Sequence, residues 1–184
     1  RFIVSHAGNN EFKLLTRSSD VQLMFQVNKL QKMKHNTSLG SRIALVHNGS
    51  ALFTGDAGQG ESNIRRWVLE NDWLEAIIAL PLNIFYNTGI ATYIWVLANK
   101  KAEARRGKVQ LIDASQWFQP LRRNLGKKNC ELSDGDIQRI LDLYLGEAQE
   151  AAQCKWFDTQ DFGYWKITVE RPLRLKSQLS DERI

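Results

Sequence analysis

Cysteine, histidine and long apolar runs are scarce in this chain of 184 residues, and each shortage excludes a class of protein. Its two cysteines, Cys130 and Cys154, form no CxxC pair, which predicts reduced thiols in a cytosolic protein. The three histidines have no ligand spacing, so no zinc site is expected. No run reaches the ~18 apolar residues of a membrane span. No signal peptide precedes the first expected element, so we expect a soluble protein that is not secreted.

Sequence signatures of common enzyme classes are also missing. There is no G-x-S-x-G, no H-E-x-x-H and no catalytic triad order. The stretch with Gly55, Gly58 and Gly60 contains neither G-x-G-x-x-G nor G-x-x-x-x-G-K-[ST], so a flexible connection is favoured over a dinucleotide site or a P-loop. Asp113 is the one carboxylate that ends an expected strand, and we interpret it as capping the turn there.

The composition is that of a folded, basic protein. Hydrophobic residues make up 43% of the chain and include six Trp and eight Phe, enough for a packed core. The net charge is +5 and the pI is about 9.3. This suits a nucleic-acid partner, although modestly basic enzymes are common. The chain begins Arg1-Phe2-Ile3 without an initiator Met, so we expect it to be part of something longer.

Helical and strand patterns alternate along the N-terminal half. The expected elements are a loop over 1–19, a helix that begins at the N-cap Asp20, a strand over 42–46, a helix over 62–71, and strands over 76–80 and 91–97. Apolar strands alternating with amphipathic helices predict a mostly parallel sheet with both faces covered. The last two strands are joined by only about ten residues, so the final strand is expected to be antiparallel.

The remaining residues predict a smaller α+β extension. We expect a solvated charge run over 99–108, an edge strand over 109–112, an irregular basic stretch over 117–129, a helix from the Ser133/Asp136 capping box to Gly146, and a half-buried strand around 165–169. The predicted fold class is α/β. A first domain spans 1–105 and the extension spans 106–184.

Two loops lie where an open α/β sheet binds ligands, beyond the carboxyl ends of its strands. Asn48 and Gly49 follow one strand, and a loop over 81–90 that carries Phe85 and Tyr86 follows another. Aromatic faces, an amide, a hydroxyl and backbone amides suit a planar polar ligand such as a base. Arg65 and Arg66 lie off the apolar stripe of their helix. They are candidates for phosphate contacts, with a plain solvated face as the alternative.

The amino-acid sequence of residues 41–100 resembles that of a known family. The strings SRIALVHNGSALFTGDAGQGESNIRRWVLENDWLEAIIALP and NIFYNTGIATYIWVLANK are similar to the adenine-specific DNA methyltransferase domain of the modification subunit of type I restriction-modification systems. LP-x-x-IF-x-x-TGI-x-T is the specific part. VQLIDAS and DFGYWKITVERPLRL support it, so the resemblance covers 20–175.

The resemblance implies a fold, a reaction and a set of partners. The fold is the second half of a doubly wound, Rossmann-like sheet. The reaction moves a methyl group from S-adenosylmethionine to the exocyclic amine of an adenine that has left the stack of double-stranded DNA. A specificity subunit and a restriction subunit are the implied protein partners, in the cytoplasm of a bacterium or an archaeon.

The family's (N/D)PP(F/Y) catalytic motif and its glycine-rich cofactor loop are both absent. The chain is therefore expected to contain no catalytic residue, and neither to methylate DNA nor to hold the cofactor unaided. By position, Phe85, Tyr86 and Thr88 would flank the extruded adenine, and Asn48 and Gly49 would lie next to the catalytic loop. Phe85 as a core residue, and Thr88 as part of a simple turn, are the alternatives.

Two other functions compete with an incomplete methyltransferase. One is a non-catalytic basic α/β module that binds DNA or sister subunits. The other is an unrelated α/β enzyme with its site elsewhere. The missing first half would leave a sheet edge and apolar faces uncovered, so we expect the chain to associate with itself.

Overall fold

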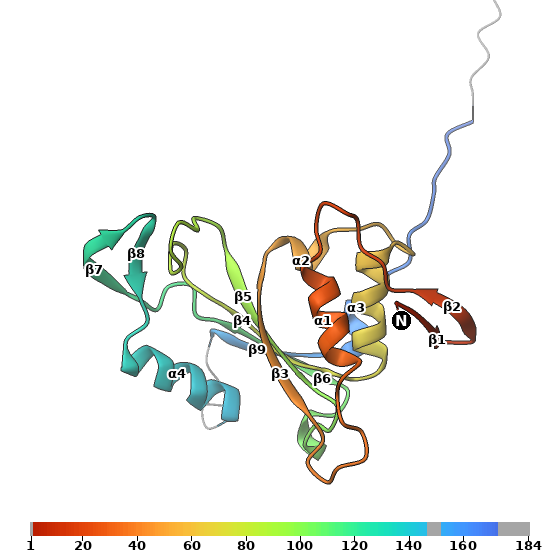
Figure 1. The fold of residues 1–184 in the computed structure, drawn as a ribbon, viewed down its shortest axis with the longest axis horizontal. Helices are drawn as coiled ribbons and strands as arrows, with labels where there is room; N and C mark the ends of the chain where they lie inside the picture. The colour runs from red at the N-terminus through yellow and green to blue at the C-terminus, as the bar shows by residue number, and fades with distance from the viewer. Residues whose placement is uncertain (1, 147–151, 173–184) are drawn as a thin grey trace, which may run out of the picture.

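A mixed five-stranded sheet forms the centre of the computed structural model, which describes residues 2–146 and 152–172 (Figure 1). The strand order is β3-β5-β4-β6-β9. The strands are β3 (Arg42–Asn48), β4 (Leu74–Ala79), β5 (Thr92–Ala98), β6 (Lys108–Asp113) and β9 (Cys154–Asp158). In this sheet β4 and β6 are parallel, and the other neighbouring pairs are antiparallel.

The prediction that β5 runs antiparallel to β4 is confirmed, but the prediction of a mostly parallel sheet is wrong. The short connection after β4 returns β5 alongside it, and β5 inserts between β4 and β3 and pairs antiparallel with both. A connection this short cannot make the crossover that a parallel neighbour requires. The apolar run of β5 indicated burial on both faces correctly, but burial does not determine strand direction.

Helices cover both faces of the sheet, as the sequence predicted. The helices α1 (Gln22–Leu30) and α3 (Gly60–Glu70) lie on one face, and α4 (Asp134–Leu145) lies on the other (Figure 1). The α1/α3 face buries Leu23, Val27, Ile64 and Val68 against Trp95 and Leu97, and the α4 face buries Ile140 and Leu143 against Ala76, Ile78, Val96 and Ile112. Truncating one such core side chain costs about 2–5 kcal/mol.

The ends of two helices test the capping predictions. The Ser133 side chain accepts from the Asp136 N–H, the Asp136 carboxylate accepts from the Ser133 N–H, and Gly146 is the C-cap, so the α4 boundaries are confirmed. The N-cap of α1 is Val21, so Asp20 as N-cap is wrong. The Asp20 carboxylate instead accepts from the backbone N–H and the side-chain amide of Gln22.

Two hairpins occupy stretches that were expected to be irregular. β1 (Ile3–His6) pairs with β2 (Asn9–Lys13), and β7 (Gln119–Leu125) pairs with β8 (Lys128–Glu131). The predictions of irregular structure in these two stretches are therefore wrong. The strands were not expected because neither hairpin shows clear apolar alternation. Their strands depend on tertiary contacts, such as the burial of Phe12 against the α1/α3 core.

The C-terminal extension also differs from expectation. β6 is not an edge strand, because β9 pairs along its outer side, and Trp165, Ile167 and Val169 are exposed and outside any strand. The sheet runs across the boundary predicted at residue 105, although the domain division itself stays a prediction. The expected strand and tail beyond 172 lie outside the described residues.

Cys130 and Cys154 are both free thiols. Within residues 2–146 and 152–172, none of the helices has the length and apolar character needed to cross a bilayer. The same described residues contain no group of three or more side chains suited to hold a metal ion.

Candidate functional site

The loops singled out in the sequence meet at one edge of the sheet, which we call the carboxyl edge. Asn48 at the end of β3 is paired with Thr92 at the start of β5. Ala79 at the end of β4 is paired with Tyr93 of β5 and with Asp113 of β6. The connection from β4 to β5, which contains residues 81–90, therefore leaves the sheet beside Asn48.

Asn48 is held in a fixed orientation by its neighbours. Its Oδ1 accepts hydrogen bonds from Gln22 Nε2 at 2.9 Å and from the Ser50 backbone N–H at 2.9 Å. Its own backbone N–H donates to Gln22 Oε1 at 3.1 Å. Among the described residues its Nδ2 has no hydrogen-bond partner. The arrangement thus leaves an amide donor available at the carboxyl edge.

Asp20 supports the orientation of Asn48 through hydrogen bonds to Gln22 and Ser50. Its carboxylate accepts from Gln22 Nε2 at 3.0 Å and from Ser50 Oγ at 2.9 Å. Burial raises the pKa of Asp20, but the hydrogen bonds from Gln22 and Ser50 outweigh it and hold the pKa below its usual value. The ionised carboxylate therefore positions the two side chains that position Asn48. Nothing in the sequence pattern around Gln22 pointed to this role.

Residues 81–90 present two aromatic rings to solvent. Phe85 is 39% exposed and Tyr86 is 69% exposed. The Thr88 N–H donates to the Phe85 carbonyl at 3.2 Å, and the Thr88 hydroxyl donates to the Tyr86 carbonyl. Thr88 thus closes the turn that carries the rings, and Phe85 lies outside the buried core, which argues against the core-packing alternative.

The other predicted residues are placed less favourably for ligand contact. Gly49 is the N-cap of the short helix α2 (Ser50–Phe53) and has an ordinary helical φ of −61°. Arg65 donates to the Ala51 carbonyl at 3.2 Å, and burial lowers its pKa. Arg66 pairs with Glu70 at 2.8 Å and lies over the Phe12 ring. Both arginines are therefore engaged within the protein, and their contact with phosphates stays a prediction.

Buried polar groups lie directly behind the carboxyl edge. His47 Nε2 is 2.8 Å from Gln26 Oε1, and its ring meets Trp95 edge-on at 5.4 Å. Burial lowers the pKa of His47, so the imidazole is neutral near neutral pH. Its Nδ1 and the Thr92 hydroxyl are buried without a hydrogen-bond partner among the described residues. Two buried polar groups behind the carboxyl edge therefore lack a hydrogen bond within the described protein.

Asp113 has the structural role that was predicted for it. Hydrogen bonds from Ser115 lower the pKa of Asp113, and the Ser115 N–H lies 3.0 Å from its Oδ1. The carboxylate closes the turn after β6, which confirms the capping interpretation. Among the described residues its hydrogen-bond partner is Ser115, and it has no histidine or lysine that could act as a base beside it.

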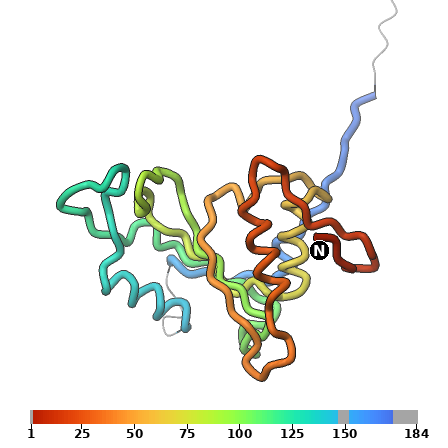
Figure 2. Tube along the Cα trace, in the orientation of Figure 1, coloured from red at the N-terminus to blue at the C-terminus, as the bar shows by residue number. Residues whose placement is uncertain are grey.

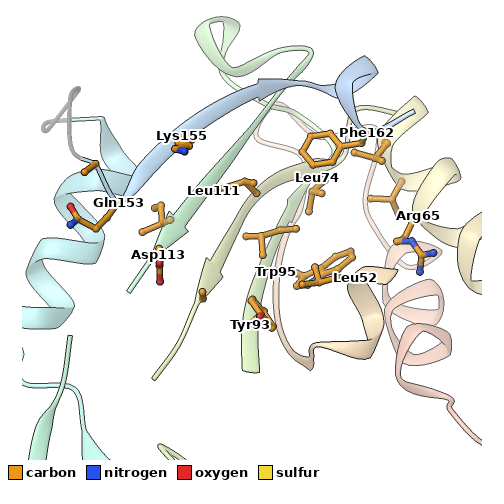
Figure 3. Close-up of a pocket in the computed structure, with 16 residues that line it drawn as sticks. Leu52, Arg65, Leu74, Tyr93, Trp95, Leu111, Asp113, Gln153, Lys155 and Phe162 are labelled. Atoms are coloured by element: carbon orange, nitrogen blue, oxygen red, sulfur yellow. The ribbon is translucent and has the colours of Figure 1, made fainter. Parts of the chain in front are cut away.

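A cavity of about 510 Å³ lies between α3 and the sheet (Figure 3). Leu74, Trp95 and Leu111 form its floor, while Leu52, Arg65 and Phe162 close one side, and Asp113, Gln153 and Lys155 lie toward the other. Of the predicted site residues, only Arg65 lines it. The walls, as far as the structure describes them, are largely apolar and contain no nucleophile next to a base, so the cavity does not provide a catalytic site.

The fold and this edge define an α/β domain with exposed aromatic and polar groups beyond the carboxyl ends of its strands, where such sheets bind ligands. Residues 9–170 match the family described as N-6 DNA Methylase. The chain belongs to this family.

Relatives with known names are longer proteins. The chain is 35% identical over 105 residues to the type I restriction enzyme MjaVII methylase subunit of Methanocaldococcus jannaschii, a match that covers 56% of this chain and 17% of the relative. It is 36% identical over 132 residues to the HindI methylase subunit of Haemophilus influenzae, covering 68% of this chain and 28% of the relative. The chain thus spans less than a third of these relatives.

Solved structures agree with the fold. The type I restriction-modification methyltransferase subunit from Streptococcus thermophilus aligns with a TM-score of 0.66 at 26% identity, over 80% of this chain and 28% of that one. A modification subunit of a putative type I restriction enzyme from Vibrio vulnificus aligns with a TM-score of 0.61 at 16% identity, over 79% of this chain and 29% of that one. The second likeness supports the fold alone.

Proposed function

We propose that this chain is the second half of the catalytic domain of an adenine-specific DNA methyltransferase, acting in a type I restriction-modification complex. Its family and its named relatives support this. The observation that carries the proposal is the carboxyl edge of the sheet, which holds both the oriented Asn48 and the loop with the exposed rings of Phe85 and Tyr86.

The geometry supports a binding role in this reaction. An adenine is methylated only after it leaves the duplex, and an extruded base is read by stacking on aromatic side chains and by hydrogen bonds to its edge. Phe85 and Tyr86 offer the stacking surfaces, and Asn48 Nδ2 offers a donor to a ring nitrogen. Thr88 keeps the turn closed. Phe85, Tyr86 and Asn48 bind and orient the base.

The cofactor expected for the family is S-adenosylmethionine, which supplies the methyl group when bound. The described residues do not fit it. Among them no F-x-G-x-G follows a strand, and the cavity beside α3 has largely apolar walls, with Asp113 as its one carboxylate beside the cations Arg65 and Lys155. We therefore propose that the cofactor is held by residues outside this chain and that the chain alone is inactive.

The proposed macromolecular partners are double-stranded DNA, a specificity subunit and a restriction subunit. Self-association of the isolated chain stays a prediction. Among the described strands, β3 pairs only with β5, and its Val46 is 52% exposed, so one edge of the sheet is open to a further strand.

A methylation assay tests the proposed activity. The full-length protein, purified with the subunits it assembles with, should transfer a labelled methyl group from S-adenosylmethionine to duplex DNA, and mass spectrometry should find N6-methyladenine. DNA binding without methylation of any duplex would favour the non-catalytic basic module. Methylation of cytosine would contradict the assignment of the base.

Calorimetry tests whether the cofactor is bound by residues outside this chain. The full-length protein should release heat on binding S-adenosylmethionine, and the 184-residue chain should release none above dilution. The sequence contains no Pro-Pro dipeptide and no F-x-G-x-G, which is why we expect this difference. Tight cofactor binding by the isolated chain would show that the site lies within it.

A further inference from the structure

The β7–β8 hairpin lies against the loop that carries the aromatic rings. Figure 2 shows the hairpin beside residues 81–90 at the same end of the molecule. The Asn129 N–H donates to the Asn83 carbonyl at 3.2 Å, and the Lys127 N–H lies 3.4 Å from Asn87 Oδ1. The Cys130 thiol donates to the Leu82 carbonyl at 3.1 Å. Both the turn and the base of the hairpin are therefore tied to the loop.

The hairpin turn approaches the loop closely. Gly126 has a φ of +61°, and a Cβ built there would lie 2.2 Å from Asn87 Oδ1. A side chain at Gly126 would therefore both strain the backbone and collide with Asn87. A Cβ at Gly126 would also lie 3.1 Å from the Tyr86 ring, so the hairpin turn packs against the part of the loop that carries the rings.

Four cations lie on this hairpin, namely Arg122, Arg123, Lys127 and Lys128. Arg122, Arg123 and Lys127 are exposed. None of the four forms an ion pair with any described residue, whereas Arg17, Arg42, Arg66, Arg105 and Arg106 are all paired with carboxylates. Glu131 is the single carboxylate in the hairpin strands and sits at the base. The hairpin cations therefore lack an anion within the described protein.

We infer that the β7–β8 hairpin is a DNA-binding arm whose arginines and lysines contact the phosphates next to the base held by Phe85 and Tyr86. This inference rests on the proposed function and adds the surface that binds the phosphate backbone of the DNA. An extruded nucleotide needs its flanking phosphates held as well as its base stacked, and cations beside aromatic rings provide both.

The charge and shape of the hairpin favour DNA over a protein partner. Protein–protein interfaces are enriched in arginine but depleted of lysine, and they are built around an apolar centre. The hairpin presents exposed cations and has Leu125 as its one exposed large apolar residue. The aromatic rings of the neighbouring loop are exposed too, so base-stacking groups and cations are both accessible at this end of the molecule.

The test measures how DNA binding depends on salt. In the full-length protein with its native subunits, Arg122→Ala/Arg123→Ala and Lys127→Ala should each weaken binding of duplex DNA similarly for all sequences. For every phosphate that a variant no longer neutralises, the slope of log K against log salt should become shallower by about 0.9. Arg122→Lys/Arg123→Lys keeps the charges and should keep most of the slope.

The matched control is Lys29→Ala/Lys32→Ala. These exposed lysines lie at the C-terminal end of α1, whose N-terminal end is the one that contacts Asn48, and the control should leave the slope unchanged. Thermal unfolding of each variant should match the wild type, since the substituted side chains are exposed.

Three outcomes would overturn the inference. One is an unchanged slope and dissociation constant in both hairpin variants. Another is loss of subunit assembly with the slope retained, which would make the hairpin a protein interface. A wild type that does not bind DNA also overturns it. A wild type that binds DNA but does not methylate adenine refutes the proposed function alone, because the comparison of slopes still decides the role of the hairpin.

Discussion

The two edges of the central sheet use polar groups in opposite ways. At the amino edge, where β3 and β4 begin, the Glu75 side chain is 2% exposed and pairs with Arg42 at 3.2 Å and with Arg105 at 3.6 Å. At the carboxyl edge, Asn48 keeps an amide donor without a partner among the described residues, and Phe85 is exposed. At the amino edge the buried charge of Glu75 is paired within the protein, whereas the carboxyl edge has groups available for something outside it.

Arg105 is the centre of the amino edge. Its guanidinium donates to Gln110 Oε1 at 3.0 Å and to the Tyr144 carbonyl, and it lies over the rings of Tyr144 and Trp156 at 4.7 and 5.0 Å. It therefore joins β4, β6, β9 and α4 through a single side chain. Buried charges of this kind stabilise only when every member has its partners.

The largest expected effect is the removal of this centre. Arg105→Ala should lower the free energy of unfolding by about 3 kcal/mol, because it leaves Glu75 buried with one partner in place of two. The matched control is Arg106→Ala, which removes an exposed pair with Glu103 and should cost less than about 1 kcal/mol. Urea unfolding of the full-length protein measures both. Equal costs would mean that the amino edge is not the more tightly constrained one.

Local signals in the sequence predicted part of the fold. The capping residues Ser133 and Asp136 and the C-cap Gly146 act within one helix, so the α4 boundaries could be found without knowing its neighbours. The same holds for the buried run of β5. By contrast, the alternation at Trp165 and Ile167 predicted a strand that has no partner strand among the described residues, and alternation cannot provide one.

Residues that depend on distant neighbours could not be found in this way. Arg105 lies in a charge run that predicted a solvated connection, and only the folded chain brings it to Glu75. The β7–β8 hairpin lacks apolar alternation and is ordered in part by its bonds to residues 81–90. The sequence located the carboxyl-edge loops but missed Gln22, which orients Asn48 from another helix.

Phe85→Ala should separate function from stability at the carboxyl edge. Base stacking on an aromatic ring is worth about 1–3 kcal/mol, so kcat/KM for methylation by the full-length protein should fall about 10- to 100-fold. Stability should fall by less than about 1 kcal/mol because the ring is already 39% exposed. Phe25→Ala, at a 64% exposed ring on α1, should change neither. Matching losses of activity and stability for Phe85→Ala would support a packing role instead.

A pair of glycines isolates the contact between the hairpin and the loop. Gly126 and Gly107 have φ values of +61° and +67°, so alanine strains the backbone similarly at both, by about 1–2 kcal/mol. Only Gly126→Ala adds a collision with Asn87, since nothing lies within 4 Å of the Gly107 position among the described residues. Gly126→Ala should therefore cost more and speed amide exchange in residues 81–90. Equal costs and unchanged exchange would show that the hairpin is not coupled to the loop.

The smallest expected effect comes from the unsatisfied interior behind the carboxyl edge. Burial depresses the pKa of His47 below 6.5, so well above that pH both the folded and unfolded states hold a neutral ring and His47 contributes no pH dependence. As the pH falls below 6.5, the unfolded chain takes up a proton that the folded chain excludes, and stability decreases. One proton limits the slope to about 1.4 kcal/mol per pH unit. Carboxylates with depressed pKa values, such as Asp20, contribute only at lower pH.

Urea unfolding between about pH 5 and 6.5 should therefore show a shallower loss of stability in His47→Gln than in the wild type. Equal slopes would mean that the buried imidazole finds a proton acceptor in the fold.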